Sequence, residues 1–167
     1  MKRLRPGFLG WLTVIVGVLI VLSIWWSPRV KQSHVAREEA LTSRQVALTC
    51  TTDMATKYHI HPELAIVING TNVPIPNGIG IRPSCMTSIH THDAGGVIHV
   101  EAPIAKDFVL GDFFAVWNKD FSQDKLLDVV VTPTTEIVVT VNGKKVDTYE
   151  NTILRDKDKI VISYQTK

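Results

Sequence analysis

The sequence lacks the motifs of several common functional classes. It has no G-x-S-x-G, no H-E-x-x-H and no glycine-rich phosphate loop, so nothing supports the hydrolases and nucleotide-binding proteins that those motifs define. It also has no cluster of lysine and arginine with interleaved aromatic residues, which is the electrostatic footprint of nucleic-acid binding. We therefore predict no nucleic-acid partner.

Cysteine is scarce, with Cys50 and Cys85 as the only two in the chain. A disulfide between them is the favoured interpretation if the domain is exported, because disulfides persist outside the cytoplasm. Metal ligation by one or both and two separate free thiols stay open. A Cys85 nucleophile with a histidine base is the least favoured, because an exported thiol near Cys50 would be oxidised.

An excess of positive charge is also missing once the first residues are set aside. Four of the 18 basic residues lie in residues 1–29, which leaves 14 basic against 16 acidic residues from Val30 onward. That part of the chain is slightly acidic and long enough to form one domain with a core.

One long hydrophobic run is present, the 19 uncharged residues from Phe8 to Trp26. Such a run can span a bilayer, basic residues precede it, and its end carries two tryptophans suited to the membrane interface. No small-residue cleavage site follows it. We predict that residues 1–29 are a single-pass membrane anchor and that the rest of the chain is extracytoplasmic.

The remaining sequence divides into a stalk and a domain. Residues 30–48 are rich in helix formers and predict a juxtamembrane helix or stalk, and residues 49–167 form the domain. In the domain, Asn69-Gly70 and Asn142-Gly143 predict type I′ hairpins, and residues 110–117 have the apolar stripe of a short helix. Residues 77–96, rich in glycine and proline, predict an irregular loop. The order of elements predicts an α+β, mostly-β domain with a mixed sheet and a short packed helix, with a β-grasp-like fold as one arrangement.

Histidine is concentrated, since five of the six histidines lie between His59 and His99. His59 and His61 form an H-x-H pair on a predicted strand, where residues i and i+2 share a face. His90 and His92 repeat the pair, and His99 stands on its own strand. Three or four imidazoles meet the ligand count of a transition metal, so we predict a copper or zinc site.

Three carboxylates lie beside these histidines. Glu63, Asp93 and Glu101 could each accept the second ring proton of a ligating histidine or bind the ion directly. Met54 and Met86 are interpreted as packing residues rather than as copper(I) ligands.

Two other functions stay open for the same histidines. Three of them could hold zinc or iron with an open position for water or oxygen, as in a zinc hydratase or hydrolase. A cupin-like oxygenase is disfavoured, because the spacing from His61 to Glu63 is too short and the second cupin motif is absent. Alternatively, the histidines form a metal-free, pH-responsive cluster in an interaction module.

The stretch from His59 to Trp117 reads as H-x-H, I-P, I-G-I, C, H-T-H-D, G-x-I-H-x-E-x-P and L-G-x-F-F-x-x-W. This pattern resembles a family of membrane-anchored or secreted prokaryotic proteins of uncharacterised activity. The resemblance implies a family label and an extracytoplasmic domain but no reaction. We therefore predict a membrane-tethered, non-enzymatic metal-binding protein for capture, delivery or sensing, with a membrane transporter or metalloenzyme as its partner.

Overall fold

The computed structural model describes residues 36, 37, 39–52 and 56–167. The predicted membrane anchor, residues 1–29, lies outside this part of the chain. Within the described residues, no helix has both the length and the apolar character needed to cross a bilayer. The elements described below belong to one compact unit, Leu41–Lys167.

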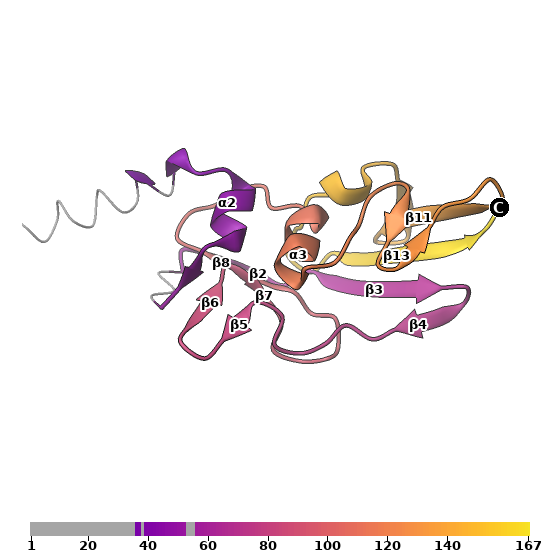
Figure 1. The fold of residues 1–167 in the computed structure, drawn as a ribbon. Helices are drawn as coiled ribbons and strands as arrows, with labels where there is room; N and C mark the ends of the chain where they lie inside the picture. The colour runs from indigo at the N-terminus through magenta and orange to yellow at the C-terminus, as the bar shows by residue number, and fades with distance from the viewer. Residues whose placement is uncertain (1–35, 38, 53–55) are drawn as a thin grey trace, which may run out of the picture. The chain divides into compact units, whose positions relative to one another are not determined.

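The largest sheet has five strands in the order β12-β11-β13-β3-β4 (Figure 1). These strands are β3 (Glu63–Ile68), β4 (Thr71–Val73), β11 (Thr135–Val141), β12 (Lys144–Val146) and β13 (Lys159–Thr166). β13 pairs with β3 in parallel, whereas the other three pairs are antiparallel. The predicted α+β, mostly-β domain with a mixed sheet is confirmed.

Alternation of side chains positions this sheet on the core. Along β13, Ile160 and Ile162 are buried, while the intervening Val161 is half-buried. On the neighbouring strand β3, Leu64 and Ile66 are buried in the same way. Because successive strand residues point to opposite faces, one face of the sheet supplies these apolar side chains to the core.

Both Asn-Gly turns close hairpins as predicted. Asn69 and Gly70, between β3 and β4, have φ angles of 51° and 80°, and Asn142 and Gly143, between β11 and β12, have 52° and 78°. Positive φ at both central residues is the requirement of a type I′ turn, which asparagine and glycine meet at least cost.

The predicted loop at residues 77–96 contains three short strands, so that prediction was wrong. They are β5 (Ile81–Arg82), β6 (Cys85–Thr87) and β7 (Ile89–His90). β6 pairs with β5 and with β1 (Cys50–Thr51), and the Cys50–Cys85 disulfide joins β1 to β6. Strands of two or three residues are too short to show a hydrophobic alternation, so the sequence pattern does not predict them. A separate ribbon pairs β9 (Lys125–Leu126) with β10 (Val129–Val130).

The helices are α2 (Ser43–Leu48), α3 (Leu110–Trp117) and the 3-10 helix η1 (Tyr149–Asn151). α2 falls within the predicted 30–48 stalk, but it contacts α3 inside the compact unit of the domain. Arg44 of α2 donates to the buried Asp112 of α3 at 2.6 Å, and Asp112 also accepts from the backbone N–H of Val109 at 3.1 Å. Both carboxylate oxygens of Asp112 are thereby paired, as a buried charge requires.

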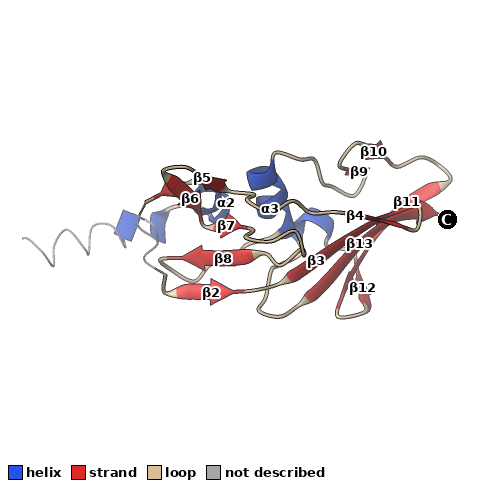
Figure 2. Ribbon diagram, turned by 90° about the horizontal axis from the view of Figure 1, so that it is seen from below, coloured by secondary structure: helices blue, strands red, loops and turns tan. Residues whose placement is uncertain are grey.

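α3 carries its apolar stripe as predicted, with Phe113 and Phe114 fully buried. Besides α2, the helix contacts η1 and the short strand β7. β7 belongs to a third sheet, in the order β2-β8-β7, with β2 (Tyr58–Ile60) and β8 (His99–Ala102). Figure 2 shows β2 leading directly into β3, so the chain passes there from the three-stranded sheet into the five-stranded sheet.

Candidate metal centre

The register of the β2-β8-β7 sheet brings the histidines together. His59 on β2 is paired with Glu101 on β8, and His90 on β7 is paired with His99 on β8. Paired residues of antiparallel strands project from the same face, and so do His99 and Glu101 at positions i and i+2. Three histidines and one carboxylate therefore share one face of this small sheet.

The opposite face of the same sheet is apolar. Ile60, Ile89 and Val100 are all buried, and they occupy the positions between the polar residues on β2, β7 and β8. The histidine segments thus alternate between polar and apolar side chains, so burying the apolar face directs the imidazoles to the other side.

His61 and His92 complete the cluster from just beyond the ends of β2 and β7. Each ring centroid lies 4.6 Å from the centroid of His99, in both cases edge-on. His90 lies 5.4 Å and His59 6.1 Å from the same ring. All five histidines that the sequence predicted therefore gather around His99, and we call them the histidine cluster.

Four side chains form the inner donor group: His90, His92, His99 and Glu101. One ligand atom from each lies within 4.8 Å of those of the others. The Nε2 atoms of His90 and His92 are 3.2 Å apart, and the Oε1 atom of Glu101 lies 3.7 Å from His90 Nε2 and 3.9 Å from His99 Nδ1. Two ligands held at about 2.0–2.1 Å by a tetrahedral ion are about 3.3–3.4 Å apart, so small side-chain movements would close this group on a metal ion.

His90 is fixed in the orientation that a ligand needs. Its side chain is fully buried, and its Nδ1 lies 3.0 Å from the carbonyl oxygen of Thr87. A carbonyl can only accept, so Nδ1 carries the proton and the Nε2 lone pair faces His92 and Glu101. A backbone partner of this kind holds the ring orientation of many metal-binding histidines.

The two most enclosed rings, those of His90 and His99, have lowered pKa values. Burial lowers the pKa of His90 below its ordinary value, although the hydrogen bond to Thr87 and the Glu101 carboxylate act in the opposite direction. Burial also lowers the pKa of His99, and the neighbouring imidazoles, led by that of His61, lower it further. Metal ligation requires neutral imidazole, so both shifts favour binding near neutral pH.

One ring nitrogen of His99 is buried without a hydrogen bond to any described residue. Its Nδ1 is buried and has no hydrogen-bond partner among the described residues. A buried polar atom left without a partner costs free energy, so such an atom calls for an explanation. Coordination of a metal ion by the imidazole cluster around His99 would supply one.

A second, outer donor group consists of His59, His61 and His99. His59 Nε2 lies 3.2 Å from Glu101 Oε1, and His61 Nδ1 lies 3.8 Å from the Oδ1 atom of Asp156. Asp156 also accepts from the backbone N–H of His61 at 2.9 Å, which holds it at this edge of the cluster. Asp156 is 95 positions away from His61, so no local pattern in the sequence connects the two residues.

The three carboxylates that the sequence singled out have different surroundings. Glu101 lies within the inner group, as described. Glu63 and Asp93 are exposed, and neither belongs to a donor group in the described part of the chain. Glu63 opens β3 of the five-stranded sheet, where it pairs with Lys159 across the strands, so it has left the sheet that holds His59.

The donors are nitrogen and oxygen. Both cysteines are consumed by the disulfide, so no thiolate is available. Imidazole with carboxylate suits zinc(II), copper(II) and related borderline ions, whereas copper(I) prefers sulfur ligands. His/Glu groups of this geometry are compatible with a bound metal ion, whose identity they leave open.

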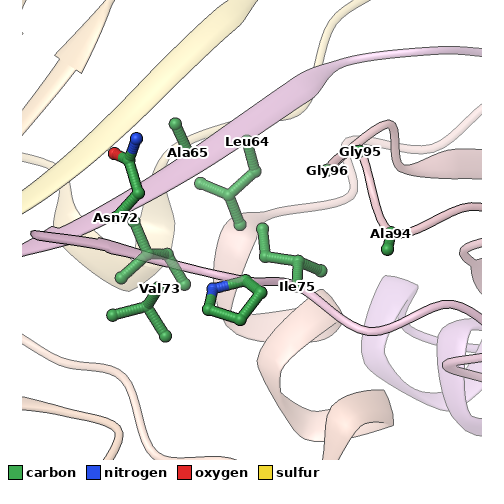
Figure 3. A pocket seen from close by; sticks show the side chains of 10 residues that line it. Leu64, Ala65, Asn72, Val73, Ile75, Ala94, Gly95 and Gly96 are labelled. Atoms are coloured by element: carbon green, nitrogen blue, oxygen red, sulfur yellow. The ribbon is translucent and has the colours of Figure 1, made fainter.

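A shallow hollow elsewhere in the domain lacks this chemistry. It has a volume of about 260 Å³ and lies between β3, β4 and the Ala94–Gly96 loop (Figure 3). Its lining is Leu64, Ala65, Ile66, Asn72, Val73, Pro74, Ile75, Ala94, Gly95 and Gly96. No titratable or nucleophilic side chain is among them, so the histidine cluster is the stronger candidate site.

Comparisons with protein-family models, with curated proteins and with solved structures find no match for this chain.

Proposed function

We propose that this protein binds one zinc(II) or copper(II) ion through the inner donor group, His90, His92, His99 and Glu101. One observation carries the proposal: strand pairing places His59, His90, His99 and Glu101 on one sheet face, beside a buried His99 Nδ1 that has no hydrogen-bond partner among the described residues. His61 and His92 join them from just beyond the ends of β2 and β7. A hydrogen-bonded histidine network without metal would be expected to satisfy that atom.

Binding is better supported than catalysis. Three imidazoles and one carboxylate fill the four positions of a tetrahedral ion, which is the pattern of a closed site, whereas a catalytic zinc keeps one position for water. No residue of the histidine cluster lines the hollow of Figure 3. Capture and delivery of an ion need neither an open coordination position nor a cavity for a substrate.

We further propose that the domain acts outside the cytoplasm, tethered by residues 1–29, and delivers its ion to a membrane transporter or metalloenzyme. The apolar run Phe8–Trp26 supports the tether, and the Cys50–Cys85 disulfide supports an oxidising compartment. An exposed His92 at the edge of the inner group gives a partner access to the ion.

Two finer assignments accompany this proposal. The segments that carry the H-x-H, H-T-H-D and G-x-I-H-x-E motifs are those that build the histidine cluster, which supports membership of the prokaryotic family with that pattern. The sheet order, with β3 and β13 parallel at its centre, hairpins on both sides and α3 between β4 and β11, supports a β-grasp-like fold.

The ligand set is tested by substitution in the full-length chain, purified without a histidine tag. His92→Gln is chosen because the ring is exposed and its loss should not disturb the core; His99→Gln removes the central ring. Each is expected to raise the Kd for zinc and copper by about 100-fold, or about 2.7 kcal/mol. His34→Gln is the matched control, because it removes an imidazole that the sequence sets apart from the cluster.

Spectroscopy separates loss of a ligand from loss of the fold. The copper(II) form is expected to show nitrogen hyperfine coupling in its electron paramagnetic resonance spectrum, weakened in His92→Gln but unchanged in His34→Gln. Unchanged affinity and spectrum in both His92→Gln and His99→Gln, with wild-type thermal unfolding, would remove the inner group as the site.

A further inference from the structure

We propose that His59 and His61 form an outer loading position, from which a single ion passes to the inner donor group while His99 stays bound to it. This inference rests on the proposed function and adds a path by which the ion reaches the inner donor group. The two positions are the outer group, His59, His61 and His99, and the inner group defined above.

Exposure decreases along this route. The side chains of His59 and His61 are 44% and 40% exposed, that of His99 is 22% exposed, and that of His90 is 0% exposed. The rings of His59 and His61 lie 4.3 Å apart, centroid to centroid, at the solvent end. Solvent offers an arriving ion two imidazoles at the outer pair but only the exposed His92 at the inner group, because the side chain of His90 is closed to solvent.

The Glu101 carboxylate lies between the two positions. Its Oε1 atom is 3.2 Å from His59 Nε2 and 3.7 Å from His90 Nε2, so one oxygen faces a ring of each group. A carboxylate in this place can follow the ion as it moves and keeps a negative charge beside it in both positions.

His99 allows only one ion at a time. It is the one residue that belongs to both donor groups. A neutral imidazole has a proton on one nitrogen and a lone pair on the other, so it can hold a single ion. Two divalent cations on the neighbouring groups would also repel each other with few carboxylates to compensate. The two groups are therefore alternative positions of one ion.

Transfer is a ligand exchange without a redox step. The bonds from the ion to His59 and His61 break as bonds to His90 and His92 form, and His99 remains a ligand throughout. The Nε2 atoms of His90 and His92 are 3.2 Å apart, so any proton that they share must leave before both can bind. His92 is exposed, and its ring proton can move to Nδ1 through solvent.

Asp156 favours the arrival of a cation at the outer pair. Its Oδ1 atom lies 3.8 Å from His61 Nδ1 and is held by the backbone N–H of His61 at 2.9 Å. Lys157 Nζ, 3.8 Å from Asp156 Oδ2, offsets part of this charge. The remaining negative potential at the solvent end attracts cations from solution, and screening by salt weakens this attraction.

The test measures rates and affinity separately in the full-length chain. Zinc loading is followed by stopped flow, release is followed by transfer to a fluorescent chelator, and Kd is measured at equilibrium. The His59→Gln/His61→Gln double variant is compared with wild type and with His34→Gln. Loading and release are expected to slow together by about tenfold, with a smaller change in Kd, because the four inner ligands are all retained.

A second variant tests the same loading position with a smaller change to the structure. Asp156→Asn keeps an oxygen for the His61 N–H but removes the charge, so it is expected to slow loading and to reduce the salt dependence of loading. Both variants are checked by thermal unfolding.

The outcomes separate this inference from the proposed function. One ion per chain with slower exchange in the double variant supports it. Wild-type rates in the folded double variant, or two ions per chain at saturation, would overturn the loading position while leaving a metal-binding protein. No binding by the wild-type chain would instead refute the proposed function itself.

Discussion

Replacing both cysteines should destabilise the domain strongly while leaving the metal ligands in place. The Cys50–Cys85 disulfide closes a loop with a sequence separation of 35 residues. In the chain-entropy description, a cross-link over about 35 residues disfavours the unfolded state by about 4 kcal/mol at 25 °C. The Cys50→Ser/Cys85→Ser variant is therefore expected to lose about that much free energy of unfolding.

The loss should be visible in thermal unfolding. For a unit of this size each kcal/mol shifts Tm by about 3–5 °C, so the double variant should unfold about 12–20 °C below the wild type. Circular dichroism measures both transitions. Reductant is the control, because it should lower the Tm of the wild type and leave that of the double variant unchanged.

The same variant tests the nitrogen and oxygen donor set. β6 leads from Cys85 to Thr87, whose carbonyl accepts from His90 Nδ1, so loosening this segment should weaken metal binding by no more than about tenfold. A Tm within about 3 °C of wild type would refute the loop-entropy argument. Loss of metal binding by a variant that is still folded would place sulfur in the site and contradict the donor set.

Three further predictions follow from the same structure. The pKa values of His90 and His99 are lowered in the folded state, so the unfolded chain binds more protons below about pH 6.5. The metal-free protein should therefore lose stability as pH falls below that value, which urea unfolding at several pH values would measure. A free energy of unfolding that does not change with pH would contradict this. Gly96 has φ of +80°, and a Cβ there would collide with the Leu64 carbonyl oxygen, so Gly96→Ala should lower the free energy of unfolding in urea by about 1–3 kcal/mol. Gly95→Ala is the matched control, because nothing lies within 4 Å of a Cβ at that position. Equal stability of the two variants would contradict this prediction. Metal at about 100 times its Kd should raise the free energy of unfolding by about 2.7 kcal/mol, and a chelator should reverse the gain; calorimetry showing no such shift would contradict native-state binding.

The sequence predicted those features of the metal centre that depend on a pattern within one segment. Alternation along His59-Ile60-His61 and along Ile98-His99-Val100 is a strand signal, and it assigns the imidazoles to one face and the apolar side chains to the other. The Asn-Gly turns were equally readable, because their chemistry is contained in two residues.

The other features of the metal centre depend on pairing between strands from different segments of the chain. The pairs His59 with Glu101 and His90 with His99 join residues from different segments, and no pattern within either segment specifies that register. Glu63 illustrates the limit: it follows His61 by two residues, but the chain passes into the five-stranded sheet at Pro62, so the spacing no longer implies a shared site. Asp156 had no local signal at all.

Whether the histidine cluster holds a metal ion can be measured by titrating the metal-free full-length chain with zinc and copper. Isothermal calorimetry on tag-free protein would measure the number of ions and the affinity together. We expect one ion per chain with a submicromolar Kd. No binding at micromolar metal would contradict a metal site and leave a hydrogen-bonded histidine network in its place.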